Sequence, residues 1–96
     1  MPLNADYKVR RSWGEALRRR RHEMEMSQVA LTIKANSCRN MISQYERGGV
    51  VPSIIVGYRI VKALNWTVEE WAEAAAKIEA DGSWYKERFD SKHDFK

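Results

Sequence analysis

The chain has 96 residues, 44% of them hydrophobic and 31% charged, with a formal net charge of +4. This length suffices for one domain with a single core but not for two. One cysteine excludes both an internal disulfide framework and a zinc site of clustered Cys and His ligands, so we expect no metal and no cofactor. There is no apolar run of transmembrane length and no secretory leader, and we therefore expect a cytoplasmic protein.

Positive charge is concentrated in the first half of the chain. Residues 1–48 carry a balance of +5 and residues 49–96 a balance of −1. This asymmetry favours a negatively charged partner, such as the phosphates of a nucleic acid. The run of four arginines at 18–21 has a second interpretation, as an ordinary solvated helix face.

Capping signals predict the first two helices. Residues 1–11 show no helical periodicity and are expected to form a flexible basic arm. Ser12 and Glu15 have the spacing of a capping box, which predicts a first helix of about ten residues starting there. Ser27 is expected to cap the second helix. The predicted inward positions of this helix are Val29, Leu31 and Thr32.

A sharp turn and a third helix are predicted next. Asn36 tolerates the left-handed backbone conformation that a sharp turn needs. Ser37 is expected to cap the third helix, and Gly48 and Gly49 to end it. The predicted inward positions of this helix are Met41, Ile42 and Tyr45.

Two further helices are predicted beyond these glycines. Pro52 and Ser53 mark the start of the fourth, over residues 54–64. Thr67 and Glu70 have the spacing of another capping box and open the fifth. The predicted core positions are Ile54, Tyr58, Val61 and Leu64 in the fourth helix, and Trp71, Ala75 and Ile78 in the fifth.

The predicted fold class is therefore all-α, with five helices. Asp81 and Gly82 break the helical pattern. We expect a compact domain at 12–80 and a polar, aromatic C-terminal tail at 81–96.

The third helix carries the side chains that indicate a function. Four of them share one face by their spacing: Arg39, Asn40, Ser43 and Gln44. Arginine can form two hydrogen bonds with guanine, and asparagine or glutamine can form two with adenine, in the major groove of double-stranded DNA. The helix expected at 38–47 is thus a candidate base reader. A merely solvated polar face is the alternative.

Several features follow one another in a defined order. They are the basic first helix, Ser27-Gln28, Leu31, the stretch from Ile42 to Gly48 (ISQYERG), Pro52-Ser53, Lys62-Ala-Leu64, and the stretch from Thr67 to Trp71 (TVEEW). No single feature is specific, but the whole set makes residues 13–72 resemble the lambda-repressor-like (Cro/C1, or XRE) helix-turn-helix family. The resemblance implies a compact five-helix DNA-binding domain, usually a homodimer, that regulates transcription as a small phage or bacterial repressor.

The resemblance also implies roles for individual residues. Base contacts are expected from Gln28, Arg39, Asn40, Ser43 and Gln44, and phosphate contacts from Ser27, Ser37, Cys38, Arg47, Gly48 and Gly49. It further implies a partly buried, structural ion pair between Arg21 and Glu46. In that arrangement Arg18, Arg19 and Arg20 remain available to other partners.

The fourth helix departs from the family pattern. Gly57 stands where relatives have a core leucine, and Tyr58 or a tryptophan is expected to fill the gap. Ile55 and Val56 are expected to form an outward apolar patch. This patch is either a dimer interface or is covered by Trp84, Tyr85 or Phe89 of the tail. A symmetric dimer predicts an inverted-repeat operator.

Two other classes of function are compatible with the sequence. An antitoxin would use the same domain to regulate its own synthesis and would bind a toxin through residues 79–96, which are charged and aromatic. An interaction module would keep the fold and recruit proteins instead. Enzymatic activity is not expected, because the sequence indicates no nucleophile–base pair and no metal cluster.

Overall fold

The computed structural model describes residues 2–86, apart from the side chains of residues 2–5, 39, 85 and 86. Every regular element in this part of the chain is a helix, so the predicted all-α class is confirmed. The elements are α1 (Pro2–Glu23), α2 (Gln28–Ala35), α3 (Arg39–Arg47), α4 (Ile54–Ala63), α5 (Val68–Asp81) and the single turn α6 (Ser83–Lys86). None of these helices is both long enough and apolar enough to cross a membrane.

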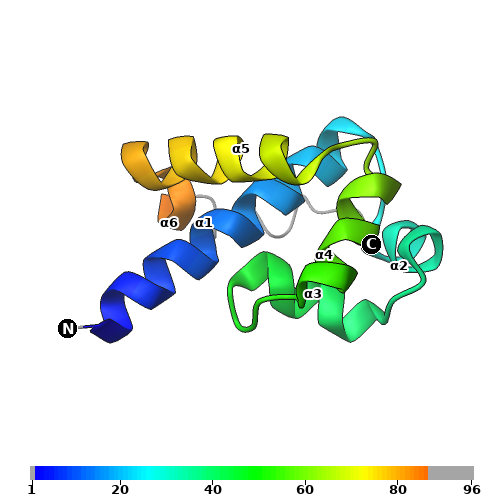
Figure 1. Ribbon diagram of the computed structural model, residues 1–96, viewed down its shortest axis with the longest axis horizontal. Helices are drawn as coiled ribbons and strands as arrows, with labels where there is room; N and C mark the ends of the chain where they lie inside the picture. Colours follow the sequence, from blue (N-terminus) through cyan, green and yellow to red (C-terminus); the bar gives the residue numbers. More distant parts are fainter. Residues whose placement is uncertain (1, 87–96) are drawn as a thin grey trace.

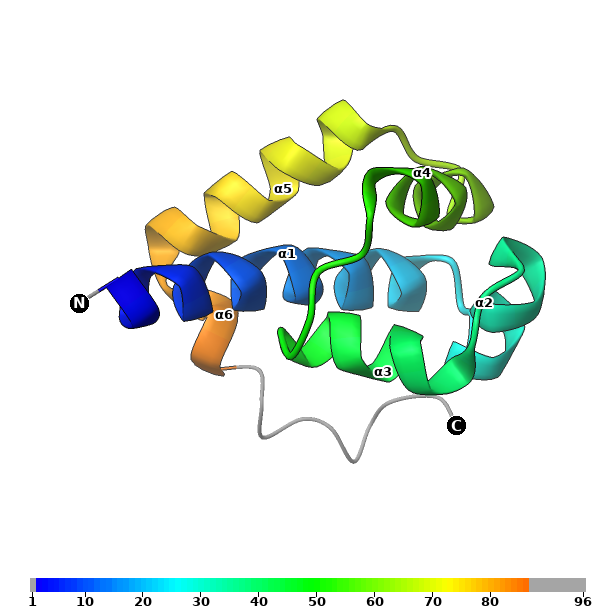
Figure 2. The same cartoon turned by 60° about the horizontal axis from the view of Figure 1, so that its bottom comes forward.

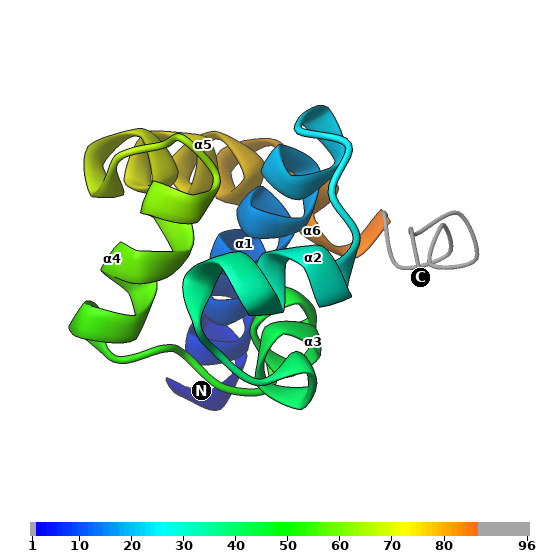
Figure 3. The same ribbon diagram turned by 90° about the vertical axis from the view of Figure 1, so that its right-hand side faces the viewer.

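Helix α1 runs through the middle of the fold. Helix α5 packs along one side of it and α3 along the other (Figure 2). Helices α2 and α4 pack against each other near the C-terminal end of α1 (Figure 1). Figure 3 shows α2 and α3 following one another on the side of the molecule away from α5. Helix α3, the candidate base reader, is thus held by α1, and α2 is held by α4.

The core takes apolar side chains from each of the first five helices. Its most deeply buried members, all at most 2% exposed, include Leu17, Leu31, Ile42, Ile60 and Leu64. Where α5 meets α1, the rings of Trp13 and Trp71 pack edge to face with their centroids 4.8 Å apart. Trp71 Nε1 also donates a hydrogen bond to the Trp13 carbonyl oxygen at 3.0 Å. Packing and this hydrogen bond together hold α5 against α1.

Most of the predicted helix ends are confirmed. The Ser27 side chain caps α2 by accepting a hydrogen bond from the Ala30 N–H. Asn36 adopts the left-handed conformation with φ 55°, and Gly48 ends α3 with φ 77°. Thr67 opens α5 with the predicted capping box. These signals are local in sequence, which is why they are visible without the fold.

The prediction of a flexible arm at 1–11 and a helix start at Ser12 is wrong for the described residues. Helix α1 begins at Pro2 and is 22 residues long. The hydroxyl of Ser12 lies inside this helix and donates to the Lys8 carbonyl oxygen at 2.8 Å. Glu15, the expected partner of Ser12, instead accepts from Arg18 and Arg19.

The N-terminal half of α1 is stabilised by contacts that are distant in sequence. The Tyr7 ring packs edge to face against Trp84, with centroids 6.0 Å apart. Arg10 Nε donates to the Gly48 carbonyl oxygen at 2.9 Å, and Arg11 Nη1 to the Arg47 carbonyl oxygen at 3.1 Å. These tertiary contacts override the weak helical pattern of the segment.

The buried face of α4 differs from the predicted one. Ile54 and Tyr58 are 77% and 53% exposed, whereas Gly57 and Ile60 are buried together with the predicted Val61 and Leu64. A β-carbon on Gly57 would lie 3.1 Å from Cζ3 of Trp71. The Trp71 indole therefore fills the space that a side chain at position 57 would occupy, and Gly57 faces the core. The prediction that a tryptophan could fill this gap is confirmed.

Two smaller predictions about α2 and α3 are also wrong. Val29 is 41% exposed, and Ala35 takes the inward position in its place. The residue that caps α3 is Cys38 and not Ser37, and the Cys38 side chain makes no capping hydrogen bond among the described residues. Leu31 is buried as predicted.

Candidate nucleic-acid interface

A three-residue turn joins α2 to α3. The left-handed Asn36 donates its N–H to the Ile33 carbonyl oxygen, and the Ser37 N–H donates to that of Thr32. These bonds close the C-terminal end of α2. Helix α3 starts immediately after Cys38, whose carbonyl oxygen accepts the first hydrogen bonds of the helix. The chain therefore changes direction within three residues, because asparagine adopts a conformation that most residues avoid.

Helix α3 has one buried face and one exposed polar face. Ile42, Tyr45 and Glu46 are buried. The opposite face carries Asn40, Ser43, Gln44 and Arg47; of these, Ser43 is half-buried and the other three are exposed. The predicted base-reading residues Asn40, Ser43 and Gln44 therefore lie on one face. The backbone of Arg39 forms the start of α3, but its side chain lies outside the described residues, so its role stays a prediction.

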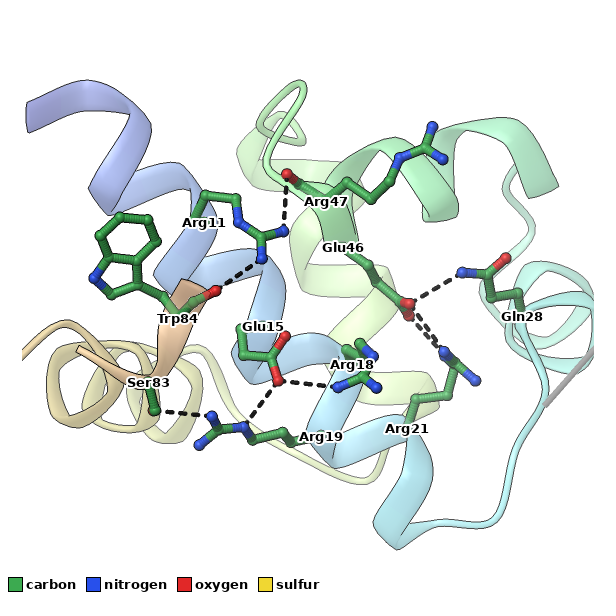
Figure 4. Close-up of polar contacts among 10 residues, drawn as sticks. All are labelled: Arg11, Glu15, Arg18, Arg19, Arg21, Gln28, Glu46, Arg47, Ser83 and Trp84. Carbon is green, nitrogen blue, oxygen red and sulfur yellow. Dashed lines mark hydrogen bonds and ion pairs between the residues drawn. The ribbon is translucent and has the colours of Figure 1, made fainter. Parts of the chain in front are cut away.

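The predicted ion pair between α1 and α3 is present and buried (Figure 4). Arg21 Nε lies 2.6 Å from Glu46 Oε2, and Arg21 Nη2 lies 2.9 Å from Glu46 Oε1. The two side chains are 0% and 3% exposed. Gln28 Nε2 donates to Glu46 Oε1 at 3.0 Å. One carboxylate thus connects α1, α2 and α3, and the remaining nitrogen of the buried guanidinium, Nη1, donates to the Met26 carbonyl oxygen at 3.0 Å.

This arrangement gives Gln28 a structural role. Its amide nitrogen is bonded to Glu46 and its side chain is half-buried. The predicted role of Gln28 as a base reader is therefore less well supported by the geometry than that of the exposed Gln44. Gln28 is placed to brace the start of α2 against the end of α3.

The prediction that Arg18, Arg19 and Arg20 are available to other partners is wrong. Arg18 Nη1 and Arg19 Nε each lie 3.0 Å from Glu15 Oε2, and this carboxylate is almost fully buried (Figure 4). Arg19 Nη2 also donates to the Ser83 hydroxyl at 2.9 Å.

Arg20 closes the end of a different helix. Its Nε and Nη2 donate to the carbonyl oxygens of Leu64 and Asn65, both at 3.1 Å, at the C-terminal end of α4. Its guanidinium lies 5.5 Å from the centre of the Trp66 ring. The arginine run is thus mainly structural. Carbonyls at helix ends lack partners within the helix, and these side chains supply them.

At the corner predicted to bind phosphate, the amides of Gly48 and Gly49 are both bonded within the chain. The Gly48 N–H donates to the Tyr45 carbonyl oxygen at 3.1 Å, and the Gly49 N–H to that of Gln44 at 2.9 Å. Both amides are needed to close the C-terminal end of α3. The exposed side chain of Arg47 stays a candidate for a phosphate contact at this corner.

The other predicted phosphate contacts lie at the N-terminal ends of α2 and α3. The Ser27 hydroxyl oxygen accepts the Ala30 N–H at 3.0 Å. Ser37 is half-buried and Cys38 is exposed, both next to the first turn of α3. The fold thus brings Ser37 and Cys38 close to the start of the polar face.

Sequence reasoning missed Gly14, which sets the distance between α1 and α3. A β-carbon there would lie 2.2 Å from the Tyr45 carbonyl oxygen and 2.7 Å from that of Glu46. Only glycine allows the two backbones this approach, which brings Arg21 and Glu46 into register. A glycine isolated in a helical pattern was the available signal, since it usually has a packing reason.

Helix α4 and the loop before it expose an apolar patch. Its members, 38% to 77% exposed, are Val50, Val51, Ile54, Ile55 and Tyr58. Of the predicted pair, Ile55 belongs to this apolar patch, whereas Val56 packs against the core. Trp84 also packs against the core, and Ile55 stays 64% exposed. Tyr85 and Phe89, the other predicted covering residues, lie outside the described side chains.

Other kinds of site find little support in the described part of the chain. No group of three His, Cys, Asp or Glu side chains there could hold a metal ion. An open groove between α1 and α5 is bordered by Trp66 and Lys77, but it lies on a different side of α1 from α3. The guanidinium of Arg20, which also borders this groove, already donates to carbonyl oxygens.

Comparison with known proteins gives a partial similarity. No family model matches the chain. A stretch of 51 residues, 53% of the chain, is 37% identical to vegetative-specific protein H7 of Dictyostelium discoideum. The match covers 49% of that protein, so the chain spans about half the length of the curated relative it matches. The name of this relative states neither a ligand nor an activity.

Proposed function

We propose that this chain is a sequence-specific double-stranded DNA-binding transcriptional regulator with a lambda-repressor-like helix-turn-helix, and that it reads the major groove with α3. The observation that carries the proposal is the division of α3 into two faces. Ile42 and Tyr45 anchor the helix in the core, while Asn40 and Gln44 are exposed on the opposite side. A helix held rigidly from behind presents its hydrogen-bonding side chains in a fixed arrangement, as base reading requires.

Each polar side chain on α3 has a proposed role. Asn40 and Gln44 have carboxamides, which can form paired hydrogen bonds with adenine. Arg39 is proposed to contact guanine, again by two hydrogen bonds. Arg47, at the C-terminal end of α3, is proposed to bind a backbone phosphate. Phosphate contacts position a protein on DNA, and base contacts make it specific.

The charge available for phosphate binding is smaller than the sequence indicates. Most arginines of α1 are bonded within the chain. Lys34 on α2, Arg47 on α3 and Arg59 on α4 are exposed, although Arg59 Nη1 also donates to the Asn36 carbonyl oxygen at 3.4 Å. These three side chains are the proposed source of electrostatic attraction on this side of the fold. Each phosphate neutralised makes the slope of log affinity against log salt steeper by about 0.9.

A homodimer is part of the proposal. The apolar patch consists of five exposed side chains, and exposed apolar patches often mark protein interfaces. A symmetric pair through α4 would present two copies of α3 to the same DNA. Such a pair reads half-sites about one helical turn apart, so the operator would be an inverted repeat.

Selection from a random duplex pool by the purified protein, at two salt concentrations, tests the proposal. Enrichment of an inverted repeat with half-sites about ten base pairs apart supports a dimeric regulator. Enrichment of a single half-site supports base reading and removes the dimer. Retention without any enriched sequence, lost at the higher salt, rejects sequence-specific regulation.

The antitoxin hypothesis stays a prediction. It requires a partner for the C-terminal segment, and residues 87–96 lie outside the described part of the chain. Only the start of that segment is described. There Ser83 and Trp84 are bonded to arginines of α1 and are therefore part of the domain.

A further inference from the structure

Two glycines follow each other at the end of α3, and the backbone requires only the first. Gly48 has φ 77°, and a β-carbon on it would lie 3.0 Å from the backbone of Arg11. Gly49 is not in the left-handed region, so its backbone conformation is open to other residues. A side chain at position 49 would therefore be limited by the residues around it and not by the backbone conformation.

The neighbour that a side chain at position 49 would meet is the carboxamide of Gln44. A β-carbon on Gly49 would lie 2.6 Å from Gln44 Oε1, closer than two such atoms can stay. The carbonyl oxygen and Cδ of the same glutamine are the next atoms, at 3.6 and 3.8 Å. The Gly49 N–H already donates to the Gln44 carbonyl oxygen. The Gln44 side chain thus folds back over the bare α-carbon of Gly49.

The orientation of this carboxamide matters for base reading. A glutamine pairs with adenine only when its oxygen and nitrogen face the matching donor and acceptor of the base. A free glutamine side chain has many rotamers, and ordering them on binding weakens the complex. A contact that limits these rotamers before binding therefore favours one base over the others.

We propose that Gly49 is a positioning residue for Gln44, and that its bare α-carbon holds the carboxamide in the orientation that meets a base edge. This inference rests on the proposed function. A methyl group at position 49 displaces the carboxamide and so changes base preference. It leaves the core unaltered, because the displaced atom is the far end of a flexible, exposed side chain.

The contact can be tested in the free protein. The chain has two glutamines, Gln28 and Gln44, so their side-chain amide NMR signals are readily assigned. In Gly49→Ala, the Gln44 amide signal is expected to shift and its ¹⁵N relaxation to change. Gln28 is bonded to Glu46 and is expected to keep its signal. An unchanged Gln44 signal overturns the proposal, whatever the protein binds.

The effect on reading is tested by DNA selection with the wild type, Gly49→Ala, Gln44→Ala and the double variant. Glu73→Ala is the control, because Glu73 is exposed on α5 and its replacement by alanine is compatible with a helix. Gly49→Ala is expected to lose roughly tenfold discrimination at the base pair that Gln44→Ala affects, and the double variant to resemble Gln44→Ala. Glu73→Ala is expected to keep the wild-type ranking of sequences.

Two results count against the proposal in different ways. If Gly49→Ala ranks sequences as the wild type does while Gln44→Ala does not, the positioning role of Gly49 is rejected and the proposed function stands. If the wild type enriches no sequence, the proposed function fails, and the role of Gly49 in base reading fails with it. The Gln44 amide signal separates these cases, because it reports the contact alone.

Discussion

Gly14 of α1 and Tyr45 of α3 bring their backbones into direct contact. A β-carbon on Gly14 would lie 2.2 Å from the Tyr45 carbonyl oxygen. The nearest atoms all belong to the backbone of α3, so no flexible side chain can move aside to make room. Gly14→Ala is therefore expected to push α1 and α3 apart and to lower the free energy of unfolding by about 1–3 kcal/mol or more. Thermal unfolding measures the loss. An alanine variant as stable as the wild type would show that the helices do not approach this closely.

The buried ion pair makes a second prediction. Glu46→Ala leaves the Arg21 guanidinium buried without its carboxylate and also removes the partner of Gln28. Loss of one member of a buried pair costs about 3–5 kcal/mol, which is enough to unfold a marginal domain. Glu73→Ala, at an exposed position on α5, is the matched control and should change stability little. Equal melting temperatures of the two variants would contradict the structural role of the pair.

Gln44 and Arg47 lie on the same face of α3 but are expected to respond differently to substitution. Gln44→Ala should remove preference at one base pair, at about 1–3 kcal/mol, and leave binding to unrelated DNA unchanged. Arg47→Ala should weaken all sequences alike and reduce the salt slope by about one. Binding titrations on matched and mismatched duplexes at several salt concentrations separate the two effects. Identical behaviour of the variants would remove the distinction between base and phosphate contacts.

A charged substitution in the apolar patch tests whether the patch is a dimer interface. Ile55→Asp places a carboxylate in the centre of the proposed interface and should convert a dimer to a monomer without a loss of helicity. Ile33→Asp is the control, because Ile33 is 75% exposed on α2 and lies outside the apolar patch. Sedimentation gives the oligomeric state and circular dichroism the helicity. A dimer that survives Ile55→Asp must associate through another surface.

Four local signals in the sequence predicted the local structure, whereas the capping signals at Ser12 and Ser37 did not. Ser27, Asn36, Gly48 and Thr67 act within a few residues of themselves, so their roles follow from residue type and spacing. The register of α4 could not be predicted in this way. It depends on Trp71, a residue from the next helix that occupies the space above Gly57.

The start of α1 shows the same limit. Residues 2–11 have no amphipathic pattern of their own, and they are helical because Arg10 and Arg11 bond to the end of α3 while Tyr7 packs on Trp84. Within the candidate interface, spacing alone placed Asn40, Ser43 and Gln44 on one face. The contact between Gly49 and Gln44 and the hydrogen bond from Gln28 to Glu46 depend on side-chain positions that spacing does not determine.

The arginines of α1 have a consequence for which substitutions the chain can tolerate. Arg11 donates through two nitrogens to the carbonyl oxygens of Arg47 and Trp84, and Arg20 does the same for Leu64 and Asn65. A lysine at either position would keep the net charge, but its single ammonium cannot reproduce the planar fork that spans two acceptors. Without Arg11, the end of α3 and the turn α6 would lose the donor that they share; without Arg20, the end of α4 would lose its bonds to α1. Along α1, a change that conserves charge is therefore not a conservative change.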